Sequence, residues 1–217
     1  MIPKKIHFCW FGPNEYSPLV EKCMRSWSDK LKDWEFILWN EKNSPMDHPF
    51  VKKALREKRY AFVADYVRFY ALYNFGGIYL DTDMEIIKDL TPLLDNDFFV
   101  GSETSKKICM SAGIIGSVEN NPFLFDVLKY YDTLNYYRTS PNIMDYIFSL
   151  KDYKGINIYN YKYFYPYNPY DEDKKVKQLF FSDISSETFA IHHWNFSWKL
   201  NFFQKVLDFI KKKFKLS

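Results

Sequence analysis

A short apolar strand that ends in two aspartates constrains the fold of this chain more than any other part of its sequence. Residues 78–80 are apolar and lead directly into Asp81 and Asp83. Gly76 and Gly77 permit a tight turn into this strand. Carboxylates at positions i and i+2 beyond a strand end can converge on one hard divalent cation, since Mg²⁺ and Mn²⁺ prefer oxygen ligands. An ordinary turn, in which Asp is common, accounts for the same residues, so both interpretations stay open.

A helix predicted over residues 50–74 precedes the strand. Its second half is apolar almost all round except for Asp65 and Arg68, which lie three residues apart and therefore share one helix face. Buried charges persist when they are paired or bound to a ligand. One interpretation is a private ion pair. The other is a helix face that opens onto an anionic, polyhydroxylated ligand, with Arg68 on a phosphate and Asp65 accepting hydrogen bonds from sugar hydroxyls.

The remaining pattern predicts an α/β protein whose first half is a βαβ nucleotide-binding unit. Strands are expected near residues 5–10, 35–39, 98–100 and 114–115. Helices are expected near residues 15–31, 50–74 and, after Asn121-Pro122, up to about Tyr131. In open α/β sheets, ligands bind beyond the carboxyl ends of the strands. Trp10 lies at such an end, where it either stacks on a nucleobase or belongs to the core.

Composition places the chain among ordinary folded domains. Its 217 residues suffice for one sizeable core, and 47% hydrophobic with 26% charged residues excludes a disordered chain. A net charge of +3 is too small to indicate nucleic-acid binding. Three scattered cysteines, an odd number without ligand spacing, favour a reducing cytoplasm. We expect no membrane span and no secretory leader, and therefore a bacterial cytoplasmic protein.

Two motifs resemble a known family. Residues 65–83 contain Asp-x-x-Arg followed by Gly-Gly-x-Tyr-x-Asp-x-Asp, and residues 2–12 read Ile-Pro-Lys-Lys-Ile-His-Phe-Cys-Trp-Phe-Gly. Together they resemble the sugar-binding region and first strand of glycosyltransferase family 32. That family includes bacterial capsule and O-antigen transferases and is similar, more distantly, to the catalytic domain of the large clostridial glucosylating toxins. The resemblance implies an α/β fold of the GT-A type, with a Rossmann-like first half and a central mixed sheet, forming one catalytic domain over residues 1–199.

The resemblance also implies an activity. It predicts a retaining glycosyltransferase, dependent on Mn²⁺ or Mg²⁺, that moves a sugar from a nucleotide-sugar donor to a hydroxyl of a bacterial surface glycan such as capsule or O-antigen. A UDP-sugar is favoured over a GDP-sugar because of the toxin-like Trp10 site. The expected acceptor is a glycan or a polyprenyl-linked saccharide. A nucleotide-sugar hydrolase and a non-catalytic glycan- or nucleotide-binding protein of the same fold are the alternatives.

Site residues are carried over from the family position by position. Asp83 and Asp81 would hold the metal, and Asp81 would also contact ribose and sugar hydroxyls. Arg68 and His192 would stabilise the negative charge that develops on the leaving group. His192 would also reach the metal, with His193 as the fallback, because adjacent strand residues point to opposite faces. The remaining donor-binding residues would be Trp10, Phe8, Asn40, Asp65, Arg68, Ser197 and Trp198, with Glu103 and Ser111 lining the sugar pocket.

The C-terminal residues 200–217 predict a basic amphipathic helix. Phe203, Leu207, Ile210 and Phe214 share one stripe, and lysines occupy much of the rest. Such a helix either contacts an anionic membrane surface or packs on the core with a solvated basic face. We therefore expect a cytoplasmic enzyme with possible peripheral contact at the inner face of the cytoplasmic membrane, and no nucleic-acid partner.

Overall fold

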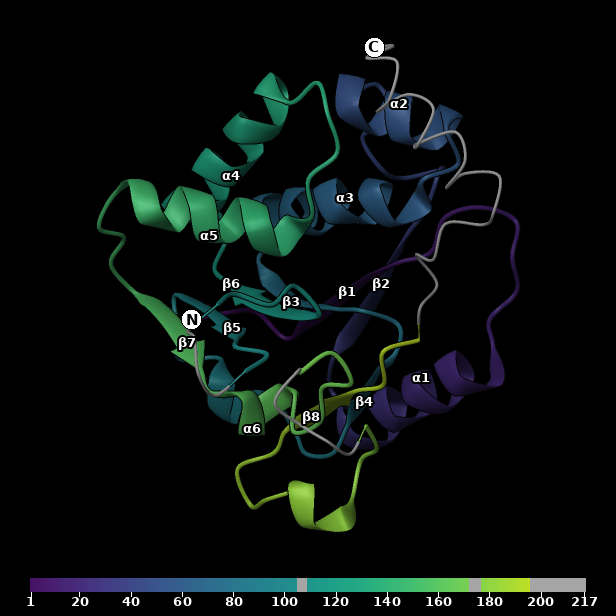
Figure 1. Ribbon diagram of the computed structural model, residues 1–217, viewed down its shortest axis with the longest axis vertical. Coiled ribbons are helices and arrows are strands. Elements are labelled where there is room, and N and C mark those ends of the chain that lie inside the picture. Colours follow the sequence, from purple (N-terminus) through teal and green to yellow (C-terminus); the bar gives the residue numbers. More distant parts are fainter. Residues whose placement is uncertain (105–108, 172–176, 196–217) are drawn as a thin grey trace.

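The computed structural model describes residues 1–104, 109–171 and 177–195 (Figure 1). A six-stranded sheet with the order β2-β1-β3-β6-β5-β7 forms its centre. The strands are β1 (Lys5–Cys9), β2 (Glu35–Trp39), β3 (Gly77–Leu80), β5 (Phe98–Gly101), β6 (Ile114–Ser117) and β7 (Ile156–Tyr159). Only β6 runs antiparallel to its neighbours in this sheet. The predicted α/β class with a central mixed sheet is confirmed.

Helices cover both faces of the sheet. Four of them, α2 (Pro49–Arg56), α3 (Tyr60–Phe75), α4 (Pro122–Thr133) and α5 (Ser140–Leu150), lie on one side (Figure 1). The other side carries α1 (Pro18–Lys30), α6 (Tyr161–Phe164) and a two-stranded ribbon of β4 (Met84–Ile86) and β8 (Ala190–His192). Alternation along β3 divides the two cores: Tyr79 packs with α3, while Ile78 and Leu80 pack with the α1 side. Two 3₁₀ turns, Thr91–Leu93 and Phe181–Asp183, complete the elements of the described ranges.

The predicted single helix over residues 50–74 is wrong as one element. The chain turns at Lys58, whose φ of 56° lies in the left-handed region, and α2 and α3 are separate helices. The amides of Lys58 and Arg59 donate to Leu55 O and Ala54 O, which satisfies carbonyls at the end of α2. The other strands and helices predicted from the pattern are present within one to three residues of their expected ends. β4 and β7 were not predicted.

The turn between α3 and β3 is fixed by packing that only glycine permits. Gly77 has a φ of 114°, and a Cβ there would lie 2.7 Å from Lys5 O. His7, which is buried, accepts a hydrogen bond from Trp39 Nε1 at its Nδ1 (3.1 Å). Its Nε2–H therefore donates to Gly76 O (2.8 Å). Burial also lowers the pKa of His7, which keeps the ring neutral. β1 and β3 are thereby locked together, and their carboxyl ends lie at one edge of the sheet.

No helix within the described ranges combines the length and apolar character needed to cross a lipid bilayer. The predicted domain boundary at residue 199 and the helix predicted over residues 200–217 fall outside the described residues.

Candidate functional site

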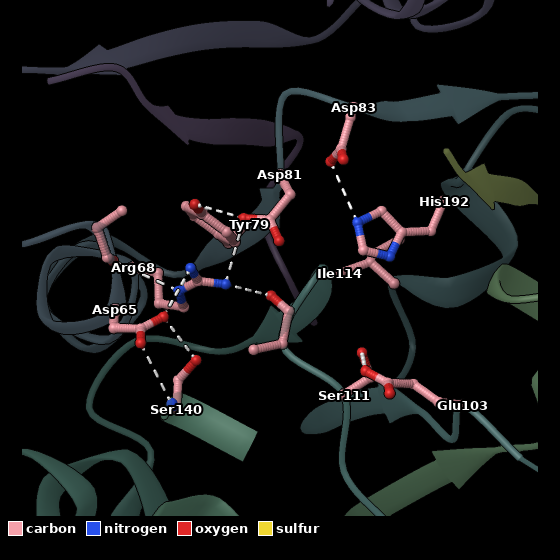
Figure 2. Close-up of polar contacts among 12 residues, drawn as sticks. Asp65, Arg68, Tyr79, Asp81, Asp83, Glu103, Ser111, Ile114, Ser140 and His192 are labelled. Carbon is pink, nitrogen blue, oxygen red and sulfur yellow. Dashed lines mark hydrogen bonds and ion pairs between the residues drawn. The ribbon is translucent and has the colours of Figure 1, made fainter. Parts of the chain in front are cut away.

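Asp81 and Asp83 lie in the turn between β3 and β4. Asp81 N–H donates to Gly113 O (2.8 Å), and Met84 N–H donates back to Asp81 O (3.0 Å), so the turn is held from both sides. The two aspartates and His192 each present a ligand atom, and these atoms all lie within 4.8 Å of one another. The expected convergence of the two carboxylates is therefore found, with His192 as the third member (Figure 2).

The segment at the end of β8 encloses Asp83. β8 pairs antiparallel with β4, opposing Met84 to His192. His192 Nε2 lies 3.2 Å from Asp83 Oδ1, while Asn195 N–H donates to Asp83 Oδ2 (2.7 Å). His193 points away and contacts Glu85 Oε2 (2.7 Å). Of the two adjacent histidines, His192 thus faces the aspartates, as strand alternation requires.

Arg68 joins the two ends of the site. Its Nη2 lies 2.9 Å from Asp65 Oδ1 and its Nη1 lies 3.3 Å from Asp81 Oδ1. Nη1 also donates to Ala112 O (2.6 Å), and the guanidinium lies over the Tyr79 ring. The side chain is only 6% exposed. The pair with Asp65 is therefore not private, but Arg68 is engaged by protein groups rather than presented to solvent.

Asp65 is saturated by protein partners. Besides Arg68 Nη2, its Oδ1 accepts from Ser140 Oγ (2.7 Å) and its Oδ2 from Ser140 N–H (3.3 Å). Its side chain is 12% exposed. Burial raises the pKa of Asp65, while Arg68 and Ser140 oppose that rise. Both carboxylate oxygens of Asp65 are therefore engaged by Arg68 and Ser140 of the protein itself.

The two turn aspartates differ electrostatically. Burial raises the pKa of Asp81 above its ordinary value, although the nearby Arg68 charge opposes this. Burial also acts to raise the pKa of Asp83, but His192 and the Asn195 amide outweigh it and the pKa of Asp83 is lowered. Burial alone would lower the pKa of His192, and the Asp83 charge raises it instead. The His192–Asp83 contact thus favours the charged form of both partners.

Geometry and charge at this centre fit a divalent cation. Cis ligands of an octahedral ion with bonds of about 2.1 Å lie about 3 Å apart, close to the 3.2 Å between His192 Nε2 and Asp83 Oδ1. Tyr79 and Arg68 both contact Asp81 through its Oδ1. Figure 2 shows the other carboxylate oxygen of Asp81 turned toward His192. His192 Nδ1 is buried without a partner in the described chain. The carboxylates of Asp65, Asp81 and Asp83 exceed the positive charge of Arg68, also when His192 is protonated, and a cation that displaces the His192 proton meets this excess negative charge.

Trp10, which was predicted to stack on the nucleobase, lies on a loop that is hydrogen-bonded to the segment around Asp83. Trp10 follows β1, and its indole Nε1 donates to Asn14 O (2.8 Å) while its ring meets Tyr16 edge-on. A surface hollow of about 470 Å³ is lined by Trp10, Asn14, Glu15, Tyr16 and Glu21. Asn195 Nδ2 donates to Ser17 Oγ (3.3 Å). This bond joins the loop between β1 and α1, which carries Trp10, to the segment that encloses Asp83.

Phe8 and Asn40, the other predicted donor-binding residues of this region, are buried and half-buried respectively. The Phe8 ring is buried against Trp27 on the α1 side of β1, so a donor contact from Phe8 would have to come from its backbone. Asn40 follows β2, where its Oδ1 accepts from Lys42 N–H (2.9 Å) within a turn. Ser197 and Trp198 fall outside the described residues.

Glu103 and Ser111 form a pair on the other side of His192. Ser111 Oγ donates to Glu103 Oε1 (2.6 Å), and Figure 2 shows both below the His192 ring. Ser111 is buried, whereas Glu103 is partly exposed. The pair therefore places one accessible carboxylate near the aspartate turn.

Sequence reasoning missed Ser140 and Asn195. Both act in part through backbone N–H groups, which leave no trace in residue type, and they contact aspartates 75 and 112 residues away. The only local signal was the Thr-Ser-Pro start of α5, which is an ordinary helix beginning.

Comparison with known proteins identifies the region that carries the site. Residues 17–100 match the family model described as "Glycosyltransferase sugar-binding region containing DXD motif". The match includes Asp65, Arg68, Asp81 and Asp83. The resemblance inferred from the motifs is therefore confirmed for this part of the chain.

Curated relatives of the chain agree with this match. The chain is 32% identical over 133 residues to inositol phosphoceramide mannosyltransferase 3 of Schizosaccharomyces pombe, which covers 59% of the chain and 36% of that protein. The chain spans less than half the length of the first curated relatives it matches.

Two solved structures show the fold. The PaToxG glycosyltransferase is similar with a TM-score of 0.53 at 15% identity, over 68% of this chain and 69% of that one. An active-site mutant of LgtC gives a TM-score of 0.51 at 15% identity, over 96% and 95%. At these identities the likeness concerns the fold, and the fold is the GT-A type of these glycosyltransferases.

Proposed function

We propose that the chain is a divalent-metal-dependent glycosyltransferase that moves a sugar from a nucleotide-sugar donor to an acceptor hydroxyl. The observation that carries the proposal is the convergence of Asp81, Asp83 and His192 at the carboxyl ends of β1 and β3. Ligands bind at this edge in open α/β sheets. The family match over residues 17–100 and the glycosyltransferase names of the relatives support the same activity.

The chain's own residues divide the work. Asp83 and His192 would hold the cation (Mn²⁺ or Mg²⁺), with Asp81 Oδ2 turned toward the same point. When bound, the cation supplies Lewis-acid neutralisation of the donor diphosphate. The hollow beside Trp10 has room for a flat nucleobase, which the indole can contact through its face. Arg68 fixes Asp81 and Ala112 O and adds a buried positive charge near the leaving group.

The stereochemical part of the proposal is retention at the anomeric carbon. It rests on the resemblance to family 32 and predicts attack by the acceptor hydroxyl on the face from which the nucleotide departs. NMR of the transfer product reads the anomeric configuration of the new glycosidic bond directly, because a glycoside does not mutarotate. An inverted product would contradict retention while leaving transferase activity intact.

The proposal extends to the donor and the acceptor. A UDP-sugar is our first choice, and the mannosyltransferase names of the curated relatives make GDP-mannose the second arm of the test. For the acceptor we propose a bacterial surface glycan carried on a lipid, reached by a cytoplasmic enzyme at the inner membrane face. Those relatives are named for a lipid acceptor, inositol phosphoceramide, so that lipid class belongs in the acceptor panel.

One experiment separates the proposal from its alternatives. The chain is incubated with each donor and Mn²⁺, with and without candidate acceptors, and nucleoside diphosphate and glycan product are both measured. A transferase makes glycan product only with acceptor and releases nucleotide faster with acceptor than by its slow hydrolysis of donor alone, whereas a nucleotide-sugar hydrolase releases nucleotide equally without one. A non-catalytic binding protein consumes no donor. Asp152→Ala, which changes an acid that is 78% exposed, is the control for Asp83→Ala.

A further inference from the structure

Ser140 begins α5, and its hydroxyl and its N–H both contact one carboxylate of another helix. Its Oγ lies 2.7 Å from Asp65 Oδ1, and its N–H donates to Asp65 Oδ2. Ser140 is 1% exposed. The preceding Thr139 makes no side-chain cap bond, and Pro141 has no N–H to offer. Asp65 on α3 therefore serves as the N-terminal cap of α5, in place of a local side chain.

The same carboxylate orients Arg68. Asp65 Oδ1 accepts from Ser140 Oγ and also lies 2.9 Å from Arg68 Nη2. With Nη2 held there, Nη1 of the planar guanidinium reaches Asp81 Oδ1 and Ala112 O. Figure 2 shows the four side chains in one row, from Ser140 through Asp65 and Arg68 to Asp81. A change at Ser140 thus reaches Asp81 through two buried links.

Asp81 needs such support because it is the more exposed end of the row. Its side chain is 29% exposed, against 6% for Arg68 and 12% for Asp65. Arg68 and Tyr79 both engage Oδ1, and this leaves Oδ2 directed toward the centre formed with Asp83 and His192. A ligand set binds most tightly when surrounding hydrogen bonds hold it in the bound geometry.

We propose that Ser140 is a positioning residue of the active site, acting through Asp65 and Arg68 to hold Asp81 Oδ2 toward the metal centre. The inference rests on the proposed function, because it assumes that Asp81 serves a cation. It assigns a role to α5, a helix that lies outside the segment matched by the family model. Ser140 does not itself touch donor, metal or acceptor.

A purely structural role for Ser140, as a helix start, predicts a different result. Loss of its hydroxyl would then lower the melting temperature and leave the properties of the folded metal centre unchanged. Ser117 provides the matched control, because it is also buried and lies at the end of β6 that is farther along the chain from Ala112. Its Oγ donates to Val118 O and to no group of the row. Ser117→Ala removes a buried hydroxyl without touching the row.

The test measures Mn²⁺ affinity of the full chain by electron paramagnetic resonance, with no nucleotide sugar present. Ser140→Ala should raise the Kd for Mn²⁺ about tenfold, the factor that corresponds to about 1.4 kcal/mol, while Ser117→Ala stays within about twofold of the unchanged chain. Asp65→Asn keeps the shape and should weaken binding similarly. Because the two act in series, Ser140→Ala with Asp65→Asn should add little to either single change.

Equal Kd values for Ser140→Ala and the unchanged chain would overturn the positioning role, as would additive losses in the double variant. If the unchanged chain itself does not bind Mn²⁺, the metal part of the proposed function is wrong. In that case the NMR signals of the Arg68 guanidinium test whether Ser140 positions Arg68 through Asp65. Signals that shift in Ser140→Ala and not in Ser117→Ala support the positioning role, and signals unmoved in both overturn it.

Discussion

Replacing Arg68 by methionine removes the charge that links the two buried acids while keeping a side chain of similar length. The guanidinium contacts Asp65, Asp81 and Ala112 O and is 6% exposed. Removing one partner of a buried ion pair costs about 3–5 kcal/mol, since the other charge stays buried. The unpaired Ala112 carbonyl adds a further cost of about 1 kcal/mol. Asp81 contributes less, because its side chain is 29% exposed and partly hydrated.

We therefore expect Arg68→Met to lose about 5 kcal/mol of unfolding free energy at neutral pH. Urea unfolding followed by circular dichroism gives this value from the shift of the midpoint at constant slope. The control is Arg25→Met, because Arg25 is 67% exposed and its contact with Glu21 spans 3.8 Å. Such a surface pair is worth about 0.5 kcal/mol or less.

The pH dependence of that loss has a definite sign. Burial raises the pKa of Asp65, and Arg68 is the group that lowers it most. Without Arg68 the folded pKa rises further, so folded Asp65 binds its proton more tightly than the unfolded chain does. The cost of the substitution is therefore small below the ordinary value of 3.8. It grows as pH rises from the folded pKa of Asp65 in the unchanged chain to its higher folded pKa in the variant. A loss below 1 kcal/mol at pH 7, or one that is constant with pH, would refute this account of Arg68.

Three further changes test other parts of the site. Asp83→Ala should abolish transfer and weaken Mn²⁺ binding in a protein that still folds, with a lower melting temperature because the contacts of Asp83 with His192 and the Asn195 amide are lost. Activity undiminished in this variant or in EDTA would rule out the metal role. The raised pKa of His192 makes protons compete with the cation, so Mn²⁺ affinity, measured by titration, should rise with pH to a point above the ordinary value of 6.5 and then level off, and this rise should be absent in His192→Ala. Removing residues 201–217 should abolish sedimentation with anionic liposomes at low salt and spare donor hydrolysis, whereas an insoluble truncated protein would assign that segment to the core.

Much of the fold was predictable because its signals are local. The apolar run 78–80, the glycines before it and the aspartates after it set a turn, a strand and a strand-end site within ten residues. The break between α2 and α3 was not predictable in this way. Glu57, Lys58 and Arg59 suit an exposed helix face as well as a turn, and a positive φ at a lysine has no sequence signature.

The candidate site likewise contains residues that were predictable from the sequence and contacts that were not. Asp81, Asp83 and His192 were recognisable from residue type within motifs, and the structure brings them together. The Asp65–Arg68 ion pair was one of the two interpretations of the sequence, and it is present. The further contacts of this pair with Ser140 and with the Ala112 carbonyl were not predictable, because those groups come from distant segments. Backbone groups such as the Asn195 amide become visible only when β8 is paired with β4.

The central claim is tested most directly by an anomalous difference map from a crystal of the full chain grown with MnCl₂ and UDP. The account predicts a manganese peak about 2.1–2.2 Å from Asp83 and His192, with Asp81 Oδ2 directed at it and the nucleotide diphosphate on its open side. A peak elsewhere, or UDP bound with no manganese between it and these three residues, would contradict the claim.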